Sequence, residues 1–316
     1  ITVDGSESTT PVATNAATTA AETQTMESLV QSLEPGYVTV FGAEIDIDVA
    51  RETIASLPAS VKVAVDHEGG TVQRLDGDGF TTVPSWETIC ETGGVASNAA
   101  TIRDSATELR SVGVDIVLGP VVDVGTSRAL GDRICSDDGD VVVEQALAVG
   151  EIYREAGLLP VYKHFPGIGD VDTDLHDEFD TTTVSAETAQ LYRELLEVEY
   201  LTAVMATFVG VTNQFDSVPC ALSTDCIGEL ERTYSETLIF SDALEMESAN
   251  GPNDEQDTDI PLEERALDAL RAGVDILLFG PDVSVTEIDA TIEALVTAAD
   301  SDEEFSSLLD EAVRKQ

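Results

Sequence analysis

The chain has very little lysine and histidine, and it carries far more acid than base. Its 316 residues include 15 Lys and Arg against 62 Asp and Glu, which gives a formal net charge of −47 at pH 7. Such a surface repels nucleic acids and anionic membranes, which argues against both as partners. Its only lysines are Lys62, Lys163 and Lys315. We interpret this balance as adaptation to high salt, where charge repulsion is screened within about 3 Å at 1 M.

Other absences exclude further classes of protein. There is no apolar run of about 18 residues, so we expect no membrane span. No Gly-x-Gly-x-x-Gly opens a helix, which removes support for a dinucleotide site, and we expect no cofactor and no catalytic metal. The cysteines have neither CxxC nor metal-ligand spacing, and we interpret them as buried thiols, although export would favour disulfides instead. They are Cys90, Cys135, Cys220 and Cys226.

A Ser/Thr/Ala-rich segment opens the chain, and we place it at residues 1–20, with Ile1–Val3 as a candidate remnant of a first strand. Residues 21–316 are predicted to form one domain, beginning with a helix over 21–33. Because the chain begins at Ile1 rather than Met, we expect an upstream segment such as a signal peptide to have been present. An exported or cell-surface location in a high-salt environment is therefore favoured over the cytoplasm.

Short apolar, β-branched runs alternate with longer amphipathic segments along the chain. The runs predict strands at Tyr37–Phe41, Val61–Val65, Val114–Leu118, Leu159–Tyr162, Ala203–Ala206, Thr237–Phe240 and Ile276–Phe279. The amphipathic segments predict helices at Ala99–Val112, Val141–Ala156, Ala186–Glu199 and Pro261–Ala272, the last with Gly273 as its C-terminal cap. This alternation indicates parallel βα units, and eight strands would close a (β/α)8 TIM-type barrel. An open doubly wound sheet is the alternative.

Polar residues follow directly after several of these runs. They are Asp66, Asp123, Lys163, His164, Thr207 and Asp242. In a barrel, catalytic side chains gather at the carboxyl ends of the strands, so this distribution favours the barrel.

The stretch Lys163–His176 holds two of the three histidines. Asp174 lies two residues before His176, so its carboxylate can hold one ring nitrogen and leave the other free for proton transfer near neutral pH. The alternative is a surface loop in which Asp170, Asp172, Asp174 and Asp177 are merely solvated.

Three further candidates are weaker when taken singly. Asp242 can be a nucleophile, a metal ligand or the N-cap of a following helix, and the residues alone favour the cap. Asp66 and Arg74, on either side of the Gly69-Gly70 turn, can clamp sugar hydroxyls, whereas His67 is interpreted as structural. Arg133 places a guanidinium in another strand-end loop.

Together, the order and spacing of the motifs resemble glycoside hydrolase family 3, in particular its single-domain β-N-acetylglucosaminidase branch. The resemblance runs from about Tyr37 to the C-terminus, where Leu309–Arg314 is similar to the closing helix of the family. The motifs are Asp66–Arg74, Gly119–Val124, Gly131–Arg133, Lys163–His176, Pro219–Ser223, Phe240–Met246 and Ala272–Gly280.

The resemblance implies a (β/α)8 barrel and retaining hydrolysis in two steps. Asp242 corresponds to the nucleophile, and His176, oriented by Asp174, corresponds to the general acid/base. The residues that correspond to sugar-binding groups of the −1 subsite are Asp66, Arg74, Arg133, Lys163 and His164.

The chain also departs from the family pattern at several positions. Ile168 stands where His is usual, Thr71 where Arg is usual and Ala243 where a second Asp is usual; Ala206-Thr-Phe208 replaces Thr-Ala-His. These changes bear on the range of substrates more than on the chemistry. The first barrel unit is expected to be imperfect, because the region before Tyr37 is short and rich in Thr and Ala.

The leading hypothesis is an exo-acting β-N-acetylglucosaminidase, monomeric, acting on cell-wall or chitin-derived oligosaccharides. The alternatives within the family are a β-glucosidase or xylosidase, or a phosphorylase that uses phosphate in place of water. An alternative of another class is a surface saccharide-binding protein without turnover. A metal site built from His164, Asp174 and His176 is a fourth possibility.

Overall fold

The computed structural model describes residues 2–3, 30, 33–41, 45–198, 203–212, 218–252 and 259–316. Most of the N-terminal segment and of the helix expected over 21–33 lies outside this part of the chain. The division into residues 1–20 and 21–316 therefore stays a prediction.

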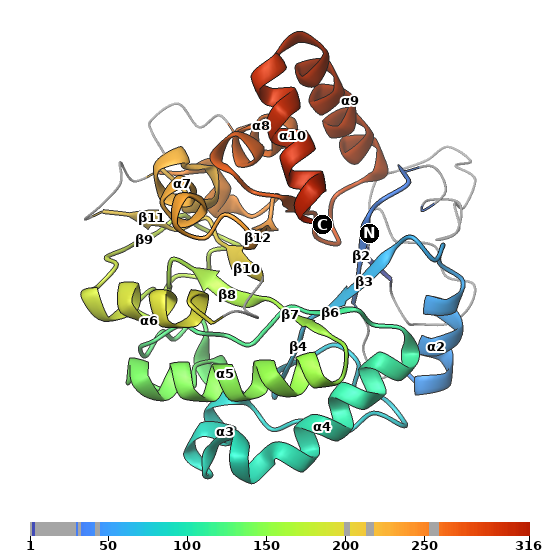
Figure 1. Cartoon of the computed structure of the whole chain (residues 1–316), viewed down its shortest axis with the longest axis vertical. Helices are drawn as coiled ribbons and strands as arrows, with labels where there is room; N and C mark the ends of the chain where they lie inside the picture. Colours follow the sequence, from blue (N-terminus) through green and yellow to red (C-terminus); the bar gives the residue numbers. More distant parts are fainter. Residues whose placement is uncertain are drawn as a thin grey trace.

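Two parallel sheets form the centre of the molecule (Figure 1). The first contains, in order, β1 (Thr2–Val3), β2 (Tyr37–Val40), β3 (Lys62–Val65), β6 (Ile116–Val117) and β7 (Leu159–Pro160). The second runs from β8 (Tyr162–Phe165) through β10 (Ala203–Ala206) and β12 (Leu238–Ala243) to β13 (Ile276–Leu278). Only Val161 separates β7 from β8, and a parallel bridge from Val121 to Lys163 joins the sheets. Eight strand positions thus follow one another in chain order.

Helices cover the outside of these strands, mostly one between successive strand positions (Figure 1). They are α2 (Ile47–Ala55), α4 (Gly94–Val112), α5 (Gly139–Glu155), α6 (Ala186–Leu196), α7 (Thr224–Thr233) and α8 (Leu262–Ala272). Two more helices, α9 (Val285–Ser301) and α10 (Glu303–Lys315), follow β13. Among the described residues, no helix is long and apolar enough to cross a bilayer.

Smaller elements lie in the loops that leave the strands. They are β4 (His67–Gly69), β5 (Val72–Gln73), α3 (Trp86–Glu91), β9 (Thr181–Thr182), β11 (Gly210–Val211) and the short 3-10 helices η1 (Gly131–Arg133), η2 (Cys220–Leu222) and η3 (Glu247–Asn250).

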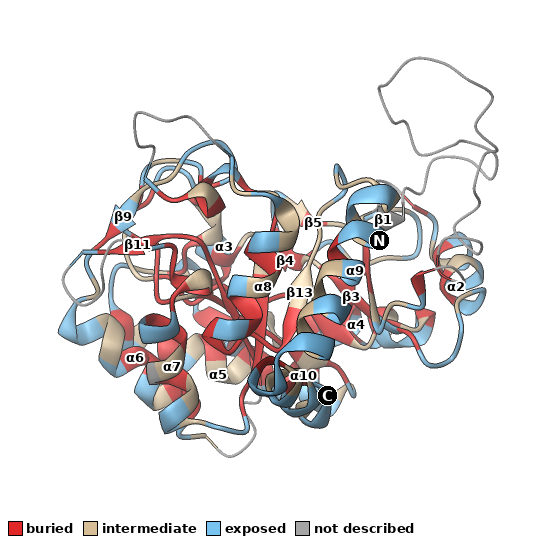
Figure 2. Ribbon diagram, turned by 90° about the horizontal axis from the view of Figure 1, so that it is seen from above, coloured by how far each residue is buried: buried red, intermediate tan, exposed pale blue. Residues whose placement is uncertain are grey.

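The strands separate an inner from an outer apolar layer, because successive side chains point to opposite faces. On β10, for example, Ala203 and Met205 belong to the inner layer and Val204 to the outer one. The inner layer is one buried cluster of side chains. Figure 2 shows the buried strands that surround it at the centre of the molecule. The members of this cluster are Ala64, Ile116, Leu118, Val161, Ala203, Met205, Leu238, Phe240 and Ile276.

Contacts across this inner layer show a barrel rather than an open sheet. Tyr37 on β2 meets Phe240 on β12 edge to face, with ring centroids 6.1 Å apart. In an open sheet with this strand order, the two strands would lie far apart. The fold is therefore of the (β/α)8 type, although the described residues contain no pairing between β13 and β1. The first strand, β1, contains two residues.

The structure confirms the predicted helices and strands that it describes, but not the prediction for the cysteines. The strands and helices predicted from Tyr37 onward are present, and Gly273 ends α8 with a φ of 110° as the expected cap. The interpretation of the cysteines as thiols is wrong, since Cys90 pairs with Cys135 and Cys220 with Cys226. The first disulfide joins α3 to the residue after Ile134, so it links loops that leave two neighbouring strands, β3 and β6. Spacing along the chain does not reveal such a contact.

Candidate active site

Polar side chains from five strand positions meet at the carboxyl rim of the barrel. Lys163 and His164 lie within β8, and Asp242 lies near the end of β12. Register explains the gathering, because parallel pairing aligns Ala206 of β10 with Phe165 of β8 and with Ser241 of β12. Thr207 and Asp242 are therefore neighbours on adjacent strands, next to the segment that carries His164.

Four charged residues form what we call the buried ion cluster: Asp66, Glu68, Arg133 and Lys163. The Lys163 Nζ lies 2.6 Å from Asp66 Oδ1 and 2.6 Å from Glu68 Oε1. Arg133 donates to both oxygens of Glu68, from Nε at 2.8 Å and from Nη2 at 3.0 Å. The side chains of Lys163 and Glu68 are each only 3% exposed. The cluster thus holds two cations and two carboxylates in a largely water-free place.

Attraction between opposite charges keeps Glu68 and Lys163 ionised. Burial raises the pKa of Glu68, but Lys163 and Arg133 outweigh it and bring the pKa down to about 2. Burial likewise lowers the pKa of Lys163, yet Asp66 and Glu68 outweigh it and the pKa is raised. Glu68 and Lys163 therefore do not exchange protons near neutral pH. The cluster can position a ligand through the remaining N–H groups of its cations.

His164 is fixed from both sides of its ring. Its Nδ1 lies 2.7 Å from Asp123 Oδ2, and its Nε2 lies 3.3 Å from Arg133 Nη2. Since a carboxylate accepts and a guanidinium donates, Nδ1 carries the hydrogen and Nε2 accepts. Asp123 is buried and also accepts from the Ile168 N–H at 2.7 Å. This ring is thus joined to the buried ion cluster.

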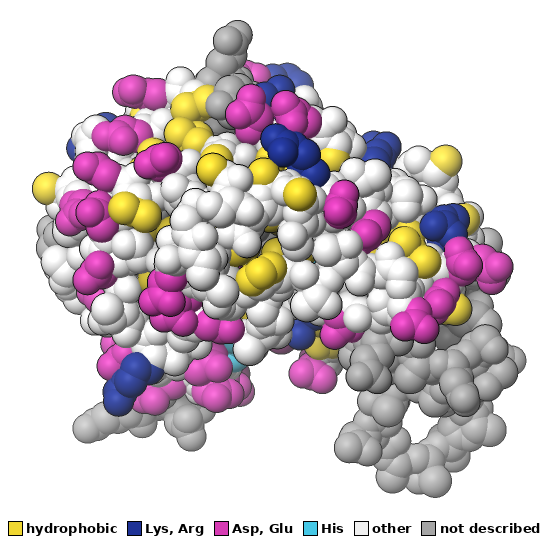
Figure 3. Space-filling model, turned by 90° about the horizontal axis from the view of Figure 1, so that it is seen from below, with side chains coloured by type: hydrophobic (Ala, Val, Ile, Leu, Met, Phe, Trp, Pro, Cys, Tyr) yellow, Lys and Arg dark blue, Asp and Glu magenta, His cyan; other side chains and the backbone are white. Residues whose placement is uncertain are grey.

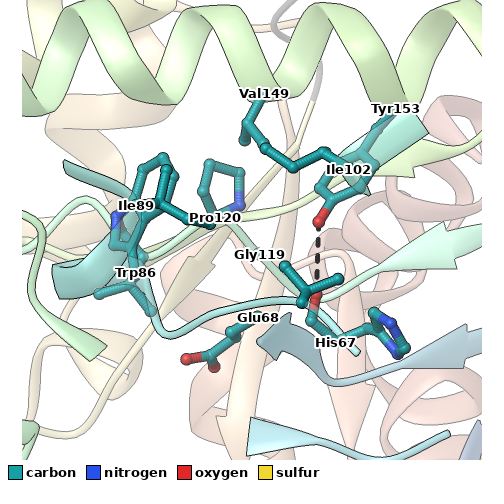
Figure 4. A pocket seen from close by; sticks show the side chains of 11 residues that line it. His67, Glu68, Trp86, Ile89, Ile102, Gly119, Pro120, Val149 and Tyr153 are labelled. Atoms are coloured by element: carbon teal, nitrogen blue, oxygen red, sulfur yellow. Dashed lines mark hydrogen bonds between the residues drawn. The ribbon is translucent and has the colours of Figure 1, made fainter. Parts of the chain in front are cut away.

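His67 has a structural role, in agreement with its interpretation from the sequence. It lines a small cavity behind the rim together with Trp86, and in Figure 4 its ring points away from the neighbouring Glu68. Its Nε2 lies 2.9 Å from the Ser105 hydroxyl, and its carbonyl accepts from the Tyr153 hydroxyl at 3.3 Å. Burial lowers the pKa of His67 to about 4, so the ring is neutral near pH 7.

Arg74 joins Asp66 through the backbone, where its N–H donates to the Asp66 carbonyl at 3.1 Å. Its guanidinium lies over the ring of Phe41, 5.3 Å from the centroid. The Arg74 Nε is buried and has no hydrogen-bond partner in the described part of the chain. Stacking on Phe41 therefore holds the side chain, and no carboxylate among the described residues pairs with it, so its guanidinium can bind a ligand.

The N-cap interpretation of Asp242 is wrong. β12 continues through Asp242 to Ala243, and the next helical turn, η3, begins at Glu247 with Met246 as its cap residue. The strand extends this far because it pairs with β10 on one side and β13 on the other. Asp242 Oδ2 accepts from the Thr207 hydroxyl at 2.9 Å, and Oδ1 accepts from the Ala243 N–H at 2.9 Å.

The expected contact between Asp174 and His176 is present. Asp174 Oδ1 lies 2.9 Å from His176 Nδ1 and accepts from the His176 N–H at 3.0 Å. Burial raises the pKa of Asp174, but the two hydrogen bonds from His176 outweigh it, and the pKa is lowered. The two side chains are 60% and 67% exposed, and His176 Nε2 has no hydrogen-bond partner among the described residues. The free nitrogen thus faces solvent, ready for proton transfer.

The loop that carries His176 is braced by its other acidic residues. Asp172 accepts from the backbone and side chain of Arg128, and Asp170 accepts from the Thr182 hydroxyl at 2.6 Å. The alternative of a merely solvated loop is therefore wrong for Asp170, Asp172 and Asp174.

The same loop is tied to the chain beyond Asp242. The Glu247 N–H donates to the His176 carbonyl at 3.1 Å, and the Ser248 N–H donates to the Leu175 carbonyl at 3.2 Å. Glu247 lies only five residues after Asp242. These bonds anchor the backbone of the His176 loop to the segment that follows the Asp242 strand end.

Three of the residues that depart from the family pattern are accommodated locally. Ile168 and Phe208 are buried in the apolar outer layer, and the Thr71 hydroxyl donates to Asp132 Oδ1 at 2.9 Å. The fourth possible site, a metal held by His164, Asp174 and His176, does not form: His164 is hydrogen-bonded to Asp123 and Arg133, whereas His176 is hydrogen-bonded to Asp174. The described residues contain no cluster of three metal-binding side chains.

Sequence reasoning assigned no role to Glu68, Asp123 or Thr207. Asp123 and Thr207 carried a signal, since both follow apolar runs. Glu68 carried less, because its partners Arg133 and Lys163 are 65 and 95 residues away in the sequence.

Comparison with known proteins identifies the family of this chain. The family model described as the glycosyl hydrolase family 3 N-terminal domain matches residues 25–315. The chain belongs to glycosyl hydrolase family 3, a family of enzymes that cleave glycosidic bonds.

Individual relatives carry more specific names. A β-hexosaminidase of Idiomarina loihiensis is 32% identical over 78% of this chain and 76% of its own length. A β-hexosaminidase of Bordetella avium is 36% identical over 68% of this chain, which spans 63% of that relative. Among solved structures, M. tuberculosis LpqI is 28% identical with a TM-score of 0.79, covering 92% of this chain and 86% of its own.

Proposed function

We propose that this chain is a retaining, exo-acting β-N-acetylglucosaminidase that releases terminal N-acetylglucosamine from cell-wall or chitin-derived oligosaccharides. The observation that supports it most is the attachment of the Asp174–His176 pair beside the Asp242 strand end. A nucleophile and a proton donor on one rim are what two-step hydrolysis requires. The β-hexosaminidase names of the relatives support the choice of sugar.

In the first step, a carboxylate oxygen of Asp242 attacks the anomeric carbon while His176 Nε2 protonates the leaving oxygen. Asp174 accepts a hydrogen bond from the Nδ1–H group and stabilises the imidazolium that exists before this transfer. In the second step, Nε2 takes a proton from water, the water oxygen bonds to the anomeric carbon, and the bond to Asp242 breaks. The negative charge of Asp242 stabilises the positive charge that develops on the sugar in both transition states.

The buried ion cluster holds the sugar in this account. Two cations and two carboxylates give it no net charge, which suits the neutral hydroxyl groups of a sugar. Arg74, Arg133 and Lys163 donate to hydroxyl oxygens, whereas Asp66 accepts from hydroxyl hydrogens. His164 completes this −1 subsite beside Arg133.

Release of nitrophenol from the aryl β-N-acetylglucosaminide, with the aryl β-glucoside in parallel, tests this function. We expect turnover of the first substrate alone, and none by an Asp242→Asn control prepared in the same way. Activity on the glucoside alone would instead support a β-glucosidase. Saccharide binding without release from either substrate, in protein shown to be folded by circular dichroism, would support a binding protein.

We also propose export into a salty environment. Two disulfides are typical of oxidising compartments, and Figure 3 shows acidic side chains scattered over the face that it draws, with few basic ones between them. The melting temperature is expected to rise steeply as salt is raised from low to molar concentration, because salt screens the repulsion. A flat melting temperature over that range would contradict the halophilic interpretation.

A further inference from the structure

Thr207 occupies a fully buried position directly after β10. Its N–H donates to the Phe165 carbonyl at 3.0 Å, and its carbonyl accepts from the Ala221 N–H at 3.1 Å. Ala221 belongs to η2, which the Cys220–Cys226 disulfide ties to α7. The backbone of Thr207 is thus held on both sides, so its side chain has a fixed origin.

The hydroxyl of this residue contacts the proposed nucleophile. Thr207 Oγ1 donates to Asp242 Oδ2 at 2.9 Å, while Oδ1 accepts from the Ala243 N–H at 2.9 Å. Each carboxylate oxygen therefore has one donor, and the two bonds together fix the plane of the group. The neighbouring Ser241 does not duplicate this role, because its hydroxyl accepts from the Leu278 N–H.

We propose that Thr207 is a positioning residue that orients Asp242 and stabilises its departure from the sugar in the second step. The inference rests on the proposed function. Among the described residues, Thr207 is the only side chain with a hydrogen bond to the Asp242 carboxylate. The hydroxyl keeps its own proton throughout and acts by donating to the oxygen that does not bond to the sugar.

The two steps use this hydrogen bond differently. When the Asp242 oxygen bonds to the anomeric carbon, the bond to the leaving oxygen breaks and the carboxylate loses its charge, so the donated bond weakens. When water attacks, the sugar–Asp242 bond breaks, its electron pair returns to the carboxylate, and the donated bond strengthens. Loss of the hydroxyl therefore slows the second step more than the first.

The test compares Thr207→Val, Thr207→Ala and Thr207→Ser with wild type on the aryl β-N-acetylglucosaminide. For Val and Ala we expect kcat to fall about 10- to 100-fold, the usual effect of losing a hydrogen bond to a charged group. KM should fall with it, a burst of nitrophenol should appear, and intact-mass spectra should show the glycosyl-enzyme accumulating. Ser restores the hydroxyl and is expected to recover most of kcat without accumulation.

Thr291→Val serves as the matched control. Thr291 is also buried, and its hydroxyl donates to the Glu287 carbonyl within α9, away from the rim. This variant should keep the wild-type kcat and show no accumulation. If Thr207→Val does not fold, the comparison of Ala with Ser carries the same information.

Two results would overturn the inference. One is a wild-type kcat in Thr207→Val and Thr207→Ala without accumulation, and the other is a Ser variant as slow as the Val variant. Either result leaves the proposed function intact, because wild type still turns over. Failure of wild type to release nitrophenol from any aryl glycoside would instead remove the proposed function.

Discussion

The buried ion cluster and the Asp174–His176 pair hold charged side chains at the same rim, but in different surroundings. Lys163 and Glu68 are each 3% exposed, and each contacts two opposite charges. Asp174 and His176 are 60% and 67% exposed, and in the described part of the chain their side chains form an ion pair with each other and with no other residue. Removing one partner of a buried pair leaves the other charge buried without compensation, whereas removing one partner of an exposed pair leaves the other charge solvated by water.

This difference separates binding from proton transfer. The side chains that hold the sugar in our account are fixed by the fold and stabilise it in return. The side chains that move the proton contribute little to the fold, so they are free to face the leaving group and water. Substitutions in the two regions should therefore fail in different ways.

Glu68→Gln should have the largest effect on stability. It leaves Arg133 without its bidentate carboxylate and Lys163 with Asp66 alone. The expected loss is about 3–5 kcal/mol in the free energy of unfolding, together with weakened saccharide binding. Urea denaturation followed by circular dichroism measures the first quantity. A loss below about 1 kcal/mol would contradict the claim that the buried ion cluster stabilises the fold.

His176→Ala should preserve the fold and remove the acid. The rate on glycosides with poor leaving groups is expected to fall about 10²- to 10⁴-fold, and the rate on nitrophenyl glycosides much less, because nitrophenolate departs without protonation. Steady-state kinetics on both kinds of substrate provide the measurement. Equal losses on both would argue against the acid role.

His67→Gln should alter the pH dependence of stability. The folded-state pKa of His67 is lowered to about 4, so its contribution is complete above the ordinary value of about 6.5 and is lost as the pH falls toward 4. As the pH falls from 7 to 4, the free energy of unfolding of the wild type should decrease by about 3 kcal/mol more than that of the variant. The difference between the two unfolding curves at pH 7 and pH 4 isolates this effect from that of the many carboxylates. Parallel curves would contradict the assignment.

Asp174→Asn should have the smallest effect on stability, less than about 1 kcal/mol, because the pair is exposed. The lowered pKa of Asp174 gives a contribution that is present above its ordinary range and is lost as the pH falls through the folded value. Activity should nevertheless fall, because the neutral amide of Asn lacks the negative charge that stabilises the protonated His176 ring. Denaturation by urea at pH 7, in parallel with turnover, separates the two outcomes.

Much of the fold was predictable because its signals are local. Continuous apolar runs such as Ala203–Ala206 predict strands because one face packs inside the barrel and the other against helices, and Gly273 marks a helix end. The pair Asp174–His176 was predictable because its members lie two residues apart. Each of these features depends on a few neighbouring residues.

The features that sequence reasoning missed depend on distant neighbours. The role of Glu68 requires Arg133 and Lys163, which only the strand order brings near. The disulfides require the approach of separate loops. The local sequence favoured a helix cap at Asp242, because the pairing with β10 and β13 that extends β12 through this residue cannot be seen in it. Tertiary contact decides such positions.

The most direct test of the account is to trap the covalent intermediate. Wild-type protein is incubated with an aryl 5-fluoro-N-acetylglucosaminide, which slows both steps, and is then analysed by intact-mass and peptide mass spectrometry, with Asp242→Asn as the control. We expect the mass of one sugar on the peptide that contains Asp242, and none on the control. Nitrophenol release by wild type without any adduct, or an adduct on another carboxylate, would contradict the assignment of Asp242 as the nucleophile.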